Sequence, residues 1–168
     1  MKFYYLLVFA CLWGIAEAHH RAGNVAATVR ATQSSTFRFF ADADNAIDGN
    51  RNPRFRDSSC SSTTRQRDPW WRVDLHDCHR IFLVRITGRN RAARRLNGAQ
   101  IRIGDSLQNN GNSNTLCATI DSIGAGETKS FFCQGTGVHG RFVNIFLPSP
   151  RQFLTLCEVE VFGALDPH

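Results

Sequence analysis

The sequence predicts an all-β fold, an eight-stranded antiparallel β-sandwich of jelly-roll type. From about Asn24 onward, short apolar runs are separated by turn residues, and no stretch keeps the 3.6-residue period of a helix for long. The chain has 168 residues, of which 42% are hydrophobic and 20% are charged, which is enough for one well-buried core. We therefore expect a single domain in which antiparallel strands form a sandwich.

The expected strands follow the apolar runs in order. In the run at 99–105, Ile101 and Ile103 fall on one face while Arg102 falls on the other, the two-residue alternation of a strand. Val159 and Val161 repeat this pattern near the end of the chain. The eight expected strands cover residues 24–32, 70–76, 81–87, 99–105, 115–121, 128–133, 140–147 and 154–162.

A long irregular segment separates the first two expected strands. Residues 40–69 are rich in Asp, Asn and Ser, and loops of this length inside a compact domain usually bind something. Within it, the stretch from Asp44 to Asn50 places oxygen-bearing side chains around a glycine, which suits a hard cation such as calcium. The spacing is not that of an EF-hand, and an Asx-turn without metal is the alternative.

The N-terminus has the pattern of a secretory signal peptide. Met1 and Lys2 precede an apolar run, and Ala16-Glu17-Ala18 supplies an A-x-A cleavage signal before His19. We expect residues 1–18 to be removed, and a secreted, extracellular domain to cover 19–168 with its core at about 24–163. The apolar run is too short for a membrane span, and no other segment approaches ~20 consecutive apolar residues. No membrane span is expected.

The cysteine count fits an oxidising compartment. Cys11 leaves with the signal peptide, so five cysteines remain. An odd number in a secreted protein predicts two disulfide bridges and one spare thiol. The sequence alone permits several pairings among Cys60, Cys78, Cys117, Cys133 and Cys157.

The formal net charge of +6 comes almost wholly from arginine, since Lys2 and Lys129 are the only lysines. The planar guanidinium suits carboxylate, sulfate, phosphate and sugar hydroxyls better than an ammonium does. The run 88–98 is the densest cluster and contains Arg89, Arg91, Arg94 and Arg95. It is either a ligand-contacting loop or a solvated basic turn on a soluble surface.

The motifs of common enzymes are absent from the sequence. It contains no G-x-S-x-G, no H-E-x-x-H, no phosphate-cradling glycine loop and no C-x-x-C. No nucleophile, base and orienting group can be nominated, so an enzyme is not expected. Nucleic acid is not an expected partner either, because Trp70 and Trp71 lie in what reads as a core strand and not on a stacking platform.

One short cluster, His76-Asp77-Cys78-His79, contains residue types that bind metals. In an extended chain His76 and His79 point to opposite faces, and Cys78 has no partner cysteine nearby in sequence. We therefore interpret it as a turn at a strand end and not as a metal site.

Six stretches together resemble the F-type lectins, the fucolectin family of fucose-binding proteins. They are NAIDGN, PWWRVDL, RLNGAQIRIGDSLQNNGN, LCATI, GRFVNIFLP and LTLCEVEVFG, and they span essentially 24–163 in the right order. The resemblance implies a galactose-binding-domain-like jelly roll that binds glycans non-covalently. It also implies a structural Ca2+ ion, a role in innate immune recognition and, as in some relatives, a homo-oligomer.

The resemblance further assigns residues to the calcium site and the disulfides. Asp48 and Glu158 would supply charge and the other positions mostly backbone oxygens, which would pin the long loop. The resemblance pairs Cys60 with Cys157 and Cys117 with Cys133, which leaves Cys78 as the free thiol. The implied calcium ligands are Asn45, Asp48, Asn50, Ser59, Cys157 and Glu158.

At the sugar site the sequence departs from the family pattern. That pattern is a His, twenty-six residues, an Arg, any residue, an Asp, four residues, and an Arg or Lys. Ser62 stands at the His position, whereas the first Arg is kept as Arg89. Arg91 replaces the Asp, and Arg95 matches the final basic position after a one-residue deletion. Ala92-Ala93 replaces an adjacent cysteine pair.

Three functions remain open from the sequence. The leading one is a lectin for fucosylated glycans with Arg89 and Arg95 as the main contacts and Ser62 as a shorter substitute for the His. The second is binding of anionic glycans, whether sulfated, sialylated or microbial, by the arginines of the run 88–98, with a steep salt dependence. The third is a structural or adhesive protein that has lost sugar binding and dimerises through Cys78.

Overall fold

The computed structural model describes residues 23–166, so the expected signal peptide and its cleavage point lie outside the described residues. Most of the regular secondary structure is β-strand. The helices in residues 23–166 are four short 3-10 helices, η1 (Ala43–Ala46), η2 (Phe55–Asp57), η3 (Ala93–Leu96) and η4 (Gln108–Gly111). None of them has the length and apolar character that a membrane crossing requires. The strands are β1 (Arg30–Gln33), β2 (Ser61–Ser62), β3 (Trp70–Thr87), β4 (Gln100–Gly104), β5 (Thr115–Thr119), β6 (Thr128–Phe132), β7 (Val138–Phe146), β8 (Thr155–Leu156) and β9 (Glu158–Leu165).

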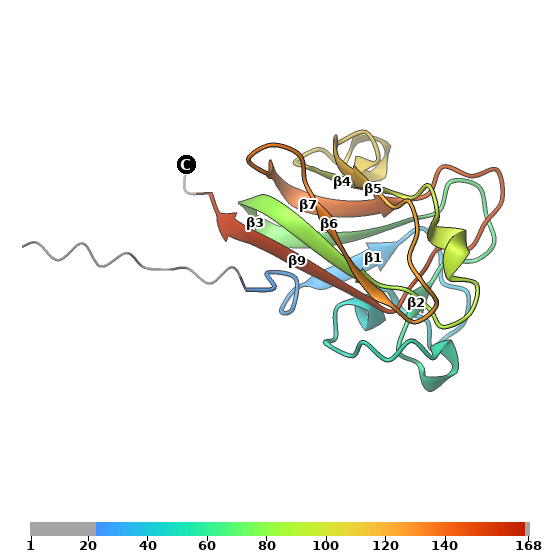
Figure 1. Ribbon diagram of the computed structural model, residues 1–168. Helices are drawn as coiled ribbons and strands as arrows, with labels where there is room; N and C mark the ends of the chain where they lie inside the picture. The colour runs from blue at the N-terminus through green and yellow to red at the C-terminus, as the bar shows by residue number, and fades with distance from the viewer. Residues whose placement is uncertain (1–22, 167–168) are drawn as a thin grey trace, which may run out of the picture.

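The long strand β3 joins the two faces of the sandwich (Figure 1). Its first part, from Trp70 to Asp74, lies between β1 and β7, and β7 continues the sheet to β4 and β5. Its last part, from Leu83 to Thr87, lies between β6 and β9. All pairings are antiparallel, so the all-β antiparallel fold predicted from the sequence is confirmed.

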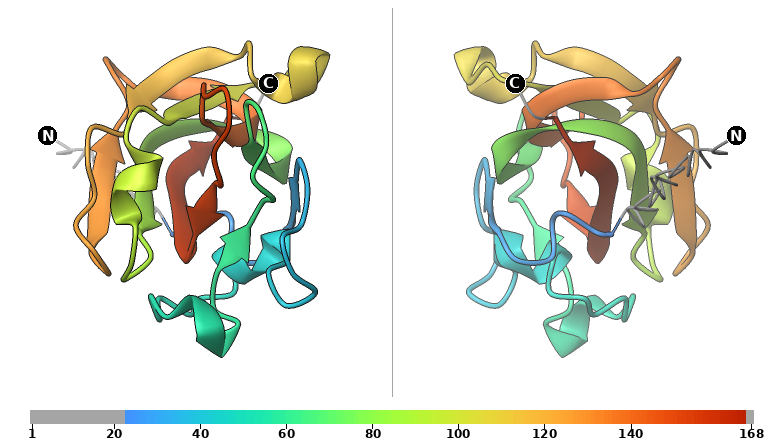
Figure 2. Two further views of the ribbon diagram at one scale, coloured as in Figure 1. Left: turned by 90° about the vertical axis from the view of Figure 1, so that its right-hand side faces the viewer. Right: turned by 90° about the vertical axis from the view of Figure 1, so that its left-hand side faces the viewer.

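The core lies between these two faces, and the end-on views in Figure 2 show the strands arranged around it. Trp71, Ile101 and Val143 come from one face, and Ile86 and Val161 come from the other. Each is fully buried. Burial of one such apolar side chain contributes about 1.5–3 kcal/mol, so the core is the main source of stability.

The expected strand count was eight, and the described residues form nine strands with different limits. The first expected strand, 24–32, shrinks to β1, because the Asn24 side-chain oxygen accepts hydrogen bonds from the backbone N–H groups of Ala26 and Val161, at 3.1 and 2.9 Å. These bonds hold the chain in a turn before β1. The expected strands 70–76 and 81–87 are one strand, β3, whose register shifts between Asp74 and His79.

The last expected strand is interrupted at Cys157, which divides it into β8 and β9. The Cys157 N–H donates to the Thr87 carbonyl, and its sulfur is bonded to Cys60. The short strand β2 was not expected, since its two serines carry no apolar pattern. It forms because β8 pairs with it, Ser61 with Leu156 and Ser62 with Thr155.

Both disulfide bridges that the resemblance implies are present, Cys60–Cys157 and Cys117–Cys133. The first joins the long loop to the last strand across 97 residues of sequence. It is packed in a second, smaller apolar cluster with Ala41 and Phe55. In the loop-entropy model, closures of such lengths contribute about 3 kcal/mol for a short loop and about 4.7 kcal/mol for a long one.

Candidate functional site

Three loops meet at the end of the sandwich that faces the viewer on the left of Figure 2. They carry Phe37, Phe55, Arg89 and Phe153, which contact one another: the Phe37 ring lies 6.3 Å from that of Phe55 and 5.3 Å from that of Phe153. Arg89 lies over the Phe55 ring at 4.7 Å. The long loop, the arginine-rich run and the loop before β8 therefore form one surface.

Arg89 occupies the centre of this surface and is only partly exposed. Its Nε is buried and has no hydrogen-bond partner within the described part of the chain. Burial lowers the pKa of its guanidinium first, and the nearby charges of Arg95, Arg91 and Arg56 lower it further. A half-buried cation with an unused donor and three like-charged neighbours is prepared to receive a polar or negative group.

Arg95 is exposed and lies over the Phe153 ring at 5.2 Å. Its backbone N–H donates to the Ala92 carbonyl at 3.0 Å, which closes the turn that opens η3. Ala92 has a φ of 58°, a left-handed conformation that is uncommon for a residue with a Cβ. The turn at the family's cysteine pair is thus formed here by two alanines, and it brings Arg95 to the same surface as Arg89.

Ser62, which stands at the family's His position, lies behind this surface. It is 3% exposed, and its hydroxyl is 2.9 Å from that of Thr155, its partner across β2 and β8. Thr155 lines a shallow hollow together with Arg89 and Arg95. Thr155 is therefore the hydroxyl-bearing residue in the lining of this hollow, and the sequence did not nominate it.

The hollow between Arg89, Arg95 and Thr155 has a volume of only about 10 Å³, roughly the room for one water. A cavity of about 320 Å³ lies beside it, between residues 54–57 and 89–91. Arg54 and Arg56 line this second cavity, whereas Arg94 lines neither. The sequence missed Arg54 and Arg56 because they precede the arginine-rich run by more than thirty residues. Their one signal was the Pro53–Asp57 stretch, PRFRD, in the long loop.

The implied calcium position contains a carboxylate that protein groups do not satisfy. Glu158 is 1% exposed, and neither of its carboxylate oxygens has a hydrogen-bond partner among residues 23–166. Burial, followed by the charges of Asp48 and Glu160, raises the pKa of Glu158 to about 7, and the nearby Gly49 backbone and Arg51 charge offset this rise only in part. A buried, unpaired acid beside a second acid fits a cation, because the cation would replace the lost solvation.

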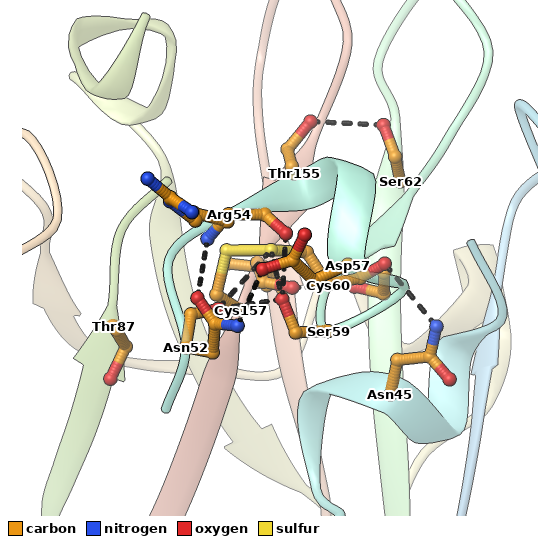
Figure 3. The surroundings of a disulfide bond; sticks show 12 residues. Asn45, Asn52, Arg54, Asp57, Ser59, Cys60, Ser62, Thr87, Thr155 and Cys157 are labelled. Carbon is orange, nitrogen blue, oxygen red and sulfur yellow. Dashed lines mark hydrogen bonds between the residues drawn. A yellow bond between two sulfur atoms is a disulfide. The ribbon is translucent and has the colours of Figure 1, made fainter. Parts of the chain in front are cut away.

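Among the remaining implied calcium ligands, Cys157 is part of the Cys60–Cys157 bridge, Ser59 lies beside it and Asn45 lies to one side of it (Figure 3). The side-chain amide of Asn45 donates to the Phe40 carbonyl at 2.7 Å, and the Asn50 N–H donates to the Asp48 carboxylate at 2.8 Å. Among the described residues no group of three or more His, Cys, Asp or Glu side chains is placed to hold a metal. A site of two carboxylates completed by backbone oxygens would contain no such group, so the observation that favours the implied ion is the unpartnered carboxylate of Glu158.

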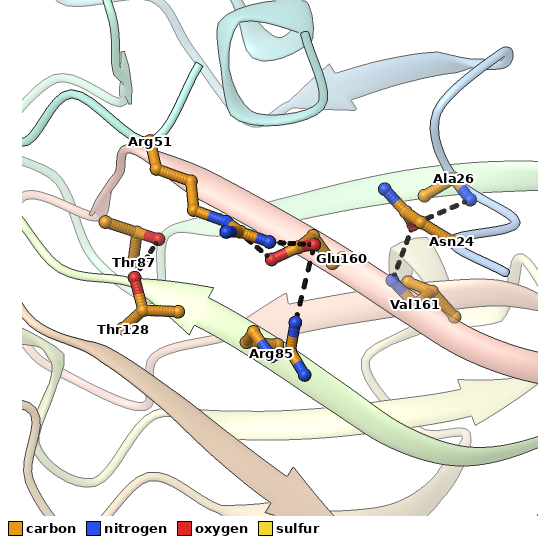
Figure 4. A network of polar contacts seen from close by, with 8 residues as sticks. All are labelled: Asn24, Ala26, Arg51, Arg85, Thr87, Thr128, Glu160 and Val161. Carbon is orange, nitrogen blue, oxygen red and sulfur yellow. Dashed lines mark hydrogen bonds and ion pairs between the residues drawn. The ribbon is translucent and has the colours of Figure 1, made fainter. Parts of the chain in front are cut away.

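Glu160, two residues further along β9, is paired (Figure 4). Its carboxylate accepts two hydrogen bonds from Arg51, at 3.0 and 2.5 Å, and lies 3.7 Å from the Arg85 guanidinium. The two-residue alternation puts Glu158 and Glu160 on the face of β9 opposite to that of Val159 and Val161. The structure buries both acids, because the long loop covers the second face of β9. Glu158 is then the acid left without a partner.

The cluster at 76–79 forms an irregular segment inside β3. His76 has a φ of 67° and its N–H donates to Asp74, while the buried His79 ring contacts the Asp77 carbonyl at 2.9 Å. Cys78 is the free cysteine of the described part, and burial raises the pKa of its thiol, followed by the charges of Asp105 and Asp166. The raised pKa lowers the thiolate fraction and with it the rate of disulfide exchange.

Comparison with known proteins gives consistent matches. Residues 45–145 match the model of the NedA-like, galactose-binding domain. The chain is 47% identical to Fucolectin-3 of Anguilla japonica over 82% of this chain and 78% of that protein, and 44% identical to Fucolectin of Anguilla anguilla over 82% and 89%.

Solved structures agree with these relatives. The fold matches an F-lectin (fucolectin) from Morone saxatilis serum with a TM-score of 0.83 and 50% identity, over 87% of this chain and 49% of that chain, so this chain spans about half of that one. It also matches a fucose binding module of Streptococcus pneumoniae with a TM-score of 0.68 and 30% identity, over 83% and 94% of the two chains.

Proposed function

The chain belongs to the fucolectin family of F-type lectins, carbohydrate-binding proteins that are not enzymes, and we propose that it binds fucosylated glycans at Arg89, Arg95 and Thr155. The supporting observation is the buried, unpartnered Nε of Arg89 beside the hollow that all three residues line. Arg89 and Arg95 each stack on a phenylalanine ring, which fixes their direction before a ligand arrives.

In this proposal the two guanidinium groups donate hydrogen bonds to sugar hydroxyls, and the Thr155 hydroxyl takes the place of the missing His. The exchange of a long donor for a short one costs about 1–3 kcal/mol, so we expect weaker binding of a single sugar than an intact family motif gives. Specificity therefore depends on what else the surface contacts. The relatives' names refer to fucose, and this chain retains both basic positions.

We also propose that Ca2+ is held by Asp48 and Glu158, with Asn45, Asn50, Ser59 and Cys157 supplying mostly backbone oxygens. When bound, the ion would supply positive charge to Asp48 and to Glu158, whose carboxylate oxygens have no hydrogen-bond partner among residues 23–166. Its role is structural, because these residues lie in the long loop and on the last strand. Arg54 and Arg56 follow in the same loop, so the ion would steady the surface beside Arg89.

Secretion and a role in innate immune recognition complete the proposal. The signal-peptide pattern of residues 1–18 and the two disulfides support export to an oxidising compartment. One structural relative is described as a serum protein. A soluble glycan binder with these properties suits the recognition of foreign cell surfaces.

A glycan array probed with calcium present tests the binding proposal. We expect fucosylated glycans to be retained by the wild-type protein and lost in Arg89→Ala. The matched control is Arg94→Ala, which removes an exposed arginine of the same run that lines neither cavity. Failure of the wild type to retain any fucosylated glycan at high protein concentration would contradict the proposal.

A further inference from the structure

The cavity between residues 54–57 and 89–91 is far larger than the hollow at the family's sugar position. Its volume is about 320 Å³ against about 10 Å³, which reaches the lower end of the size range of ligand sites in proteins. The two spaces share Arg89 and Arg91. A ligand that contacts Arg89 therefore has open room on the side away from Arg95.

The walls of this cavity are strongly positive. Its one acid is Asp57, whose carboxylate already accepts a hydrogen bond from the Asn52 side chain at 2.9 Å. The ion pairs found in residues 23–166 involve none of the cavity's arginines. Four arginines line it: Arg54, Arg56, Arg89 and Arg91.

These four positive charges act on one another, and Asp57 is the one acid in the cavity lining that opposes them. Arg91 and Arg56 are among the charges that lower the pKa of Arg89, in addition to its burial. Like charges gathered around one cavity repel one another and so raise the free energy of the unliganded protein. An anion in the cavity would add attractive interactions with the four arginines and so offset this repulsion.

One backbone hydrogen bond joins the two walls of the cavity, and further bonds hold the wall formed by the long loop. The Asn90 N–H donates to the Pro53 carbonyl at 3.0 Å, which ties the arginine-rich run to the long loop. The Ser59 hydroxyl donates to the carbonyls of Asn52 and Arg54, at 2.7 and 3.0 Å, beside the Cys60–Cys157 bridge (Figure 3). The four guanidinium groups thus start from anchored backbone, which reduces the cost of ordering them around a ligand.

We propose that this cavity binds the sulfate or phosphate ester of an acidic glycan whose adjacent sugar lies against Arg89 and Arg95. The planar guanidinium donates two parallel hydrogen bonds to such tetrahedral oxyanions, and several converging forks select them over neutral hydroxyls. The proposal rests on the glycan-binding function above and names its ligand class. The arginines proposed to contact the anion differ from those of the run 88–98 that the sequence indicated. Arg54 and Arg56 are added, and Arg94 is left out because it does not line the cavity.

The test compares one fucosylated oligosaccharide in neutral and monosulfated forms, by titration calorimetry at about 50 mM and about 0.5 M salt. The wild type is expected to bind the sulfated form about tenfold more tightly at the lower salt concentration, with a smaller ratio at the higher one. The variant Arg54→Gln/Arg56→Gln should lose this ratio and keep the affinity for the neutral form. The control Arg80→Gln/Arg94→Gln removes two positive charges outside the cavity. It should keep both the preference for the sulfated form and the affinity for the neutral form.

Equal affinity of the wild type for the two forms, or a sulfate preference that survives Arg54→Gln/Arg56→Gln, overturns the subsite. The proposed binding of fucosylated glycans is contradicted by a different result, namely that neither the wild type nor any variant binds the neutral oligosaccharide. In that case sulfate-dependent binding that requires Arg54 and Arg56 still supports the subsite. A monophosphorylated form of the same oligosaccharide, run in parallel, shows which ester is preferred, and thermal melting verifies that all variants are folded.

Discussion

Arg89 shows how a single residue combines inherited and new roles. It occupies the first basic position of the family motif, and it also lines the large cavity between the long loop and the arginine-rich run. Stacking on Phe55 and burial of Nε fix its direction. Replacement of the family's Asp by Arg91 removes a counter-charge and adds a repulsive one. A bound anion would therefore interact more favourably with Arg89 here than in a protein that keeps the family's Asp.

Thr155 and Ser62 supply a matched pair of tests at the residue scale. In Thr155→Val the hydroxyl that lines the hollow is lost while side-chain volume is nearly kept. We expect affinity for fucosylated glycans to fall about fivefold to tenfold, the loss of roughly one hydrogen bond. Titration calorimetry measures this change, and thermal melting reports the cost of leaving the buried Ser62 hydroxyl without Thr155.

Ser62→Ala is the control for this prediction. It removes the hydroxyl behind the surface and leaves Thr155 in the hollow, so glycan affinity should stay within about twofold of the wild type. A loss in Ser62→Ala as large as in Thr155→Val would assign the donor role to the serine after all.

At the scale of elements, the long loop depends on distant partners for its shape. It has two short 3-10 helices, η1 and η2, and otherwise little regular structure. The Cys60–Cys157 bridge, the Arg51–Glu160 pair and the β2–β8 pairing attach it to the end of the chain. The proposed calcium ion between Asp48 and Glu158 would add a fourth attachment. A loop fixed at several points can hold Arg54 and Arg56 in place.

Calcium should raise the melting temperature of the wild-type protein. A ligand at a hundredfold excess over its Kd stabilises the folded state by about 2.7 kcal/mol, which corresponds to roughly 5–10 °C for a domain of this size. Differential scanning fluorimetry with added calcium and then with a chelator measures the shift. Glu158→Gln should abolish it, because one of the two charged ligands is gone.

Without calcium, Glu158→Gln should melt at or above the temperature of the wild type, since an unpaired buried carboxylate is removed. Asp74→Asn is the control, because Asp74 pairs with Arg141 in the strands and lies outside the proposed set of ligands. It should retain the calcium shift. An unchanged calcium shift in Glu158→Gln would contradict the assigned site.

At the scale of the whole molecule, β3 belongs to both faces of the sandwich. Its first part pairs in the sheet that contains β4 and β7, and its last part pairs with β6 and β9. The two layers therefore share a strand as well as a core. Three loops that extend beyond one end of these strands carry the binding surface, so the surface depends on the packing of the whole sandwich.

Truncation of a core side chain should destabilise the entire domain. We expect Ile101→Ala, which empties a fully buried position in β4, to cost about 2–5 kcal/mol in the free energy of unfolding. Leu116→Ala in the neighbouring strand β5 is the control, because Leu116 is 40% exposed and surface changes usually stay within about 0.5 kcal/mol. Urea unfolding followed by fluorescence measures both, and equal effects would contradict the assigned core.

Local patterns determined much of the structure in advance. The alternation in 99–105 predicted that Ile101 and Ile103 are buried, and it is confirmed, because a strand's two faces are set by its own two-residue period. The family motif identified Arg89 and Arg95, which lie on one surface. The sequence offered no catalytic motif, so an enzyme was not expected, in agreement with the lectin family to which the chain belongs.

The tertiary structure decided what depends on segments far apart in the chain. The burial of Glu158 and Glu160 could not be read from β9, because the second face of that strand is covered by a loop more than a hundred residues earlier. Arg54 and Arg56 join Arg89 for the same reason: closure of the sandwich brings two separate loops together. Sequence periodicity indicates which face of a single strand is buried. The arginine cluster and the cavity that it lines form only where several loops pack together, so periodicity does not predict them.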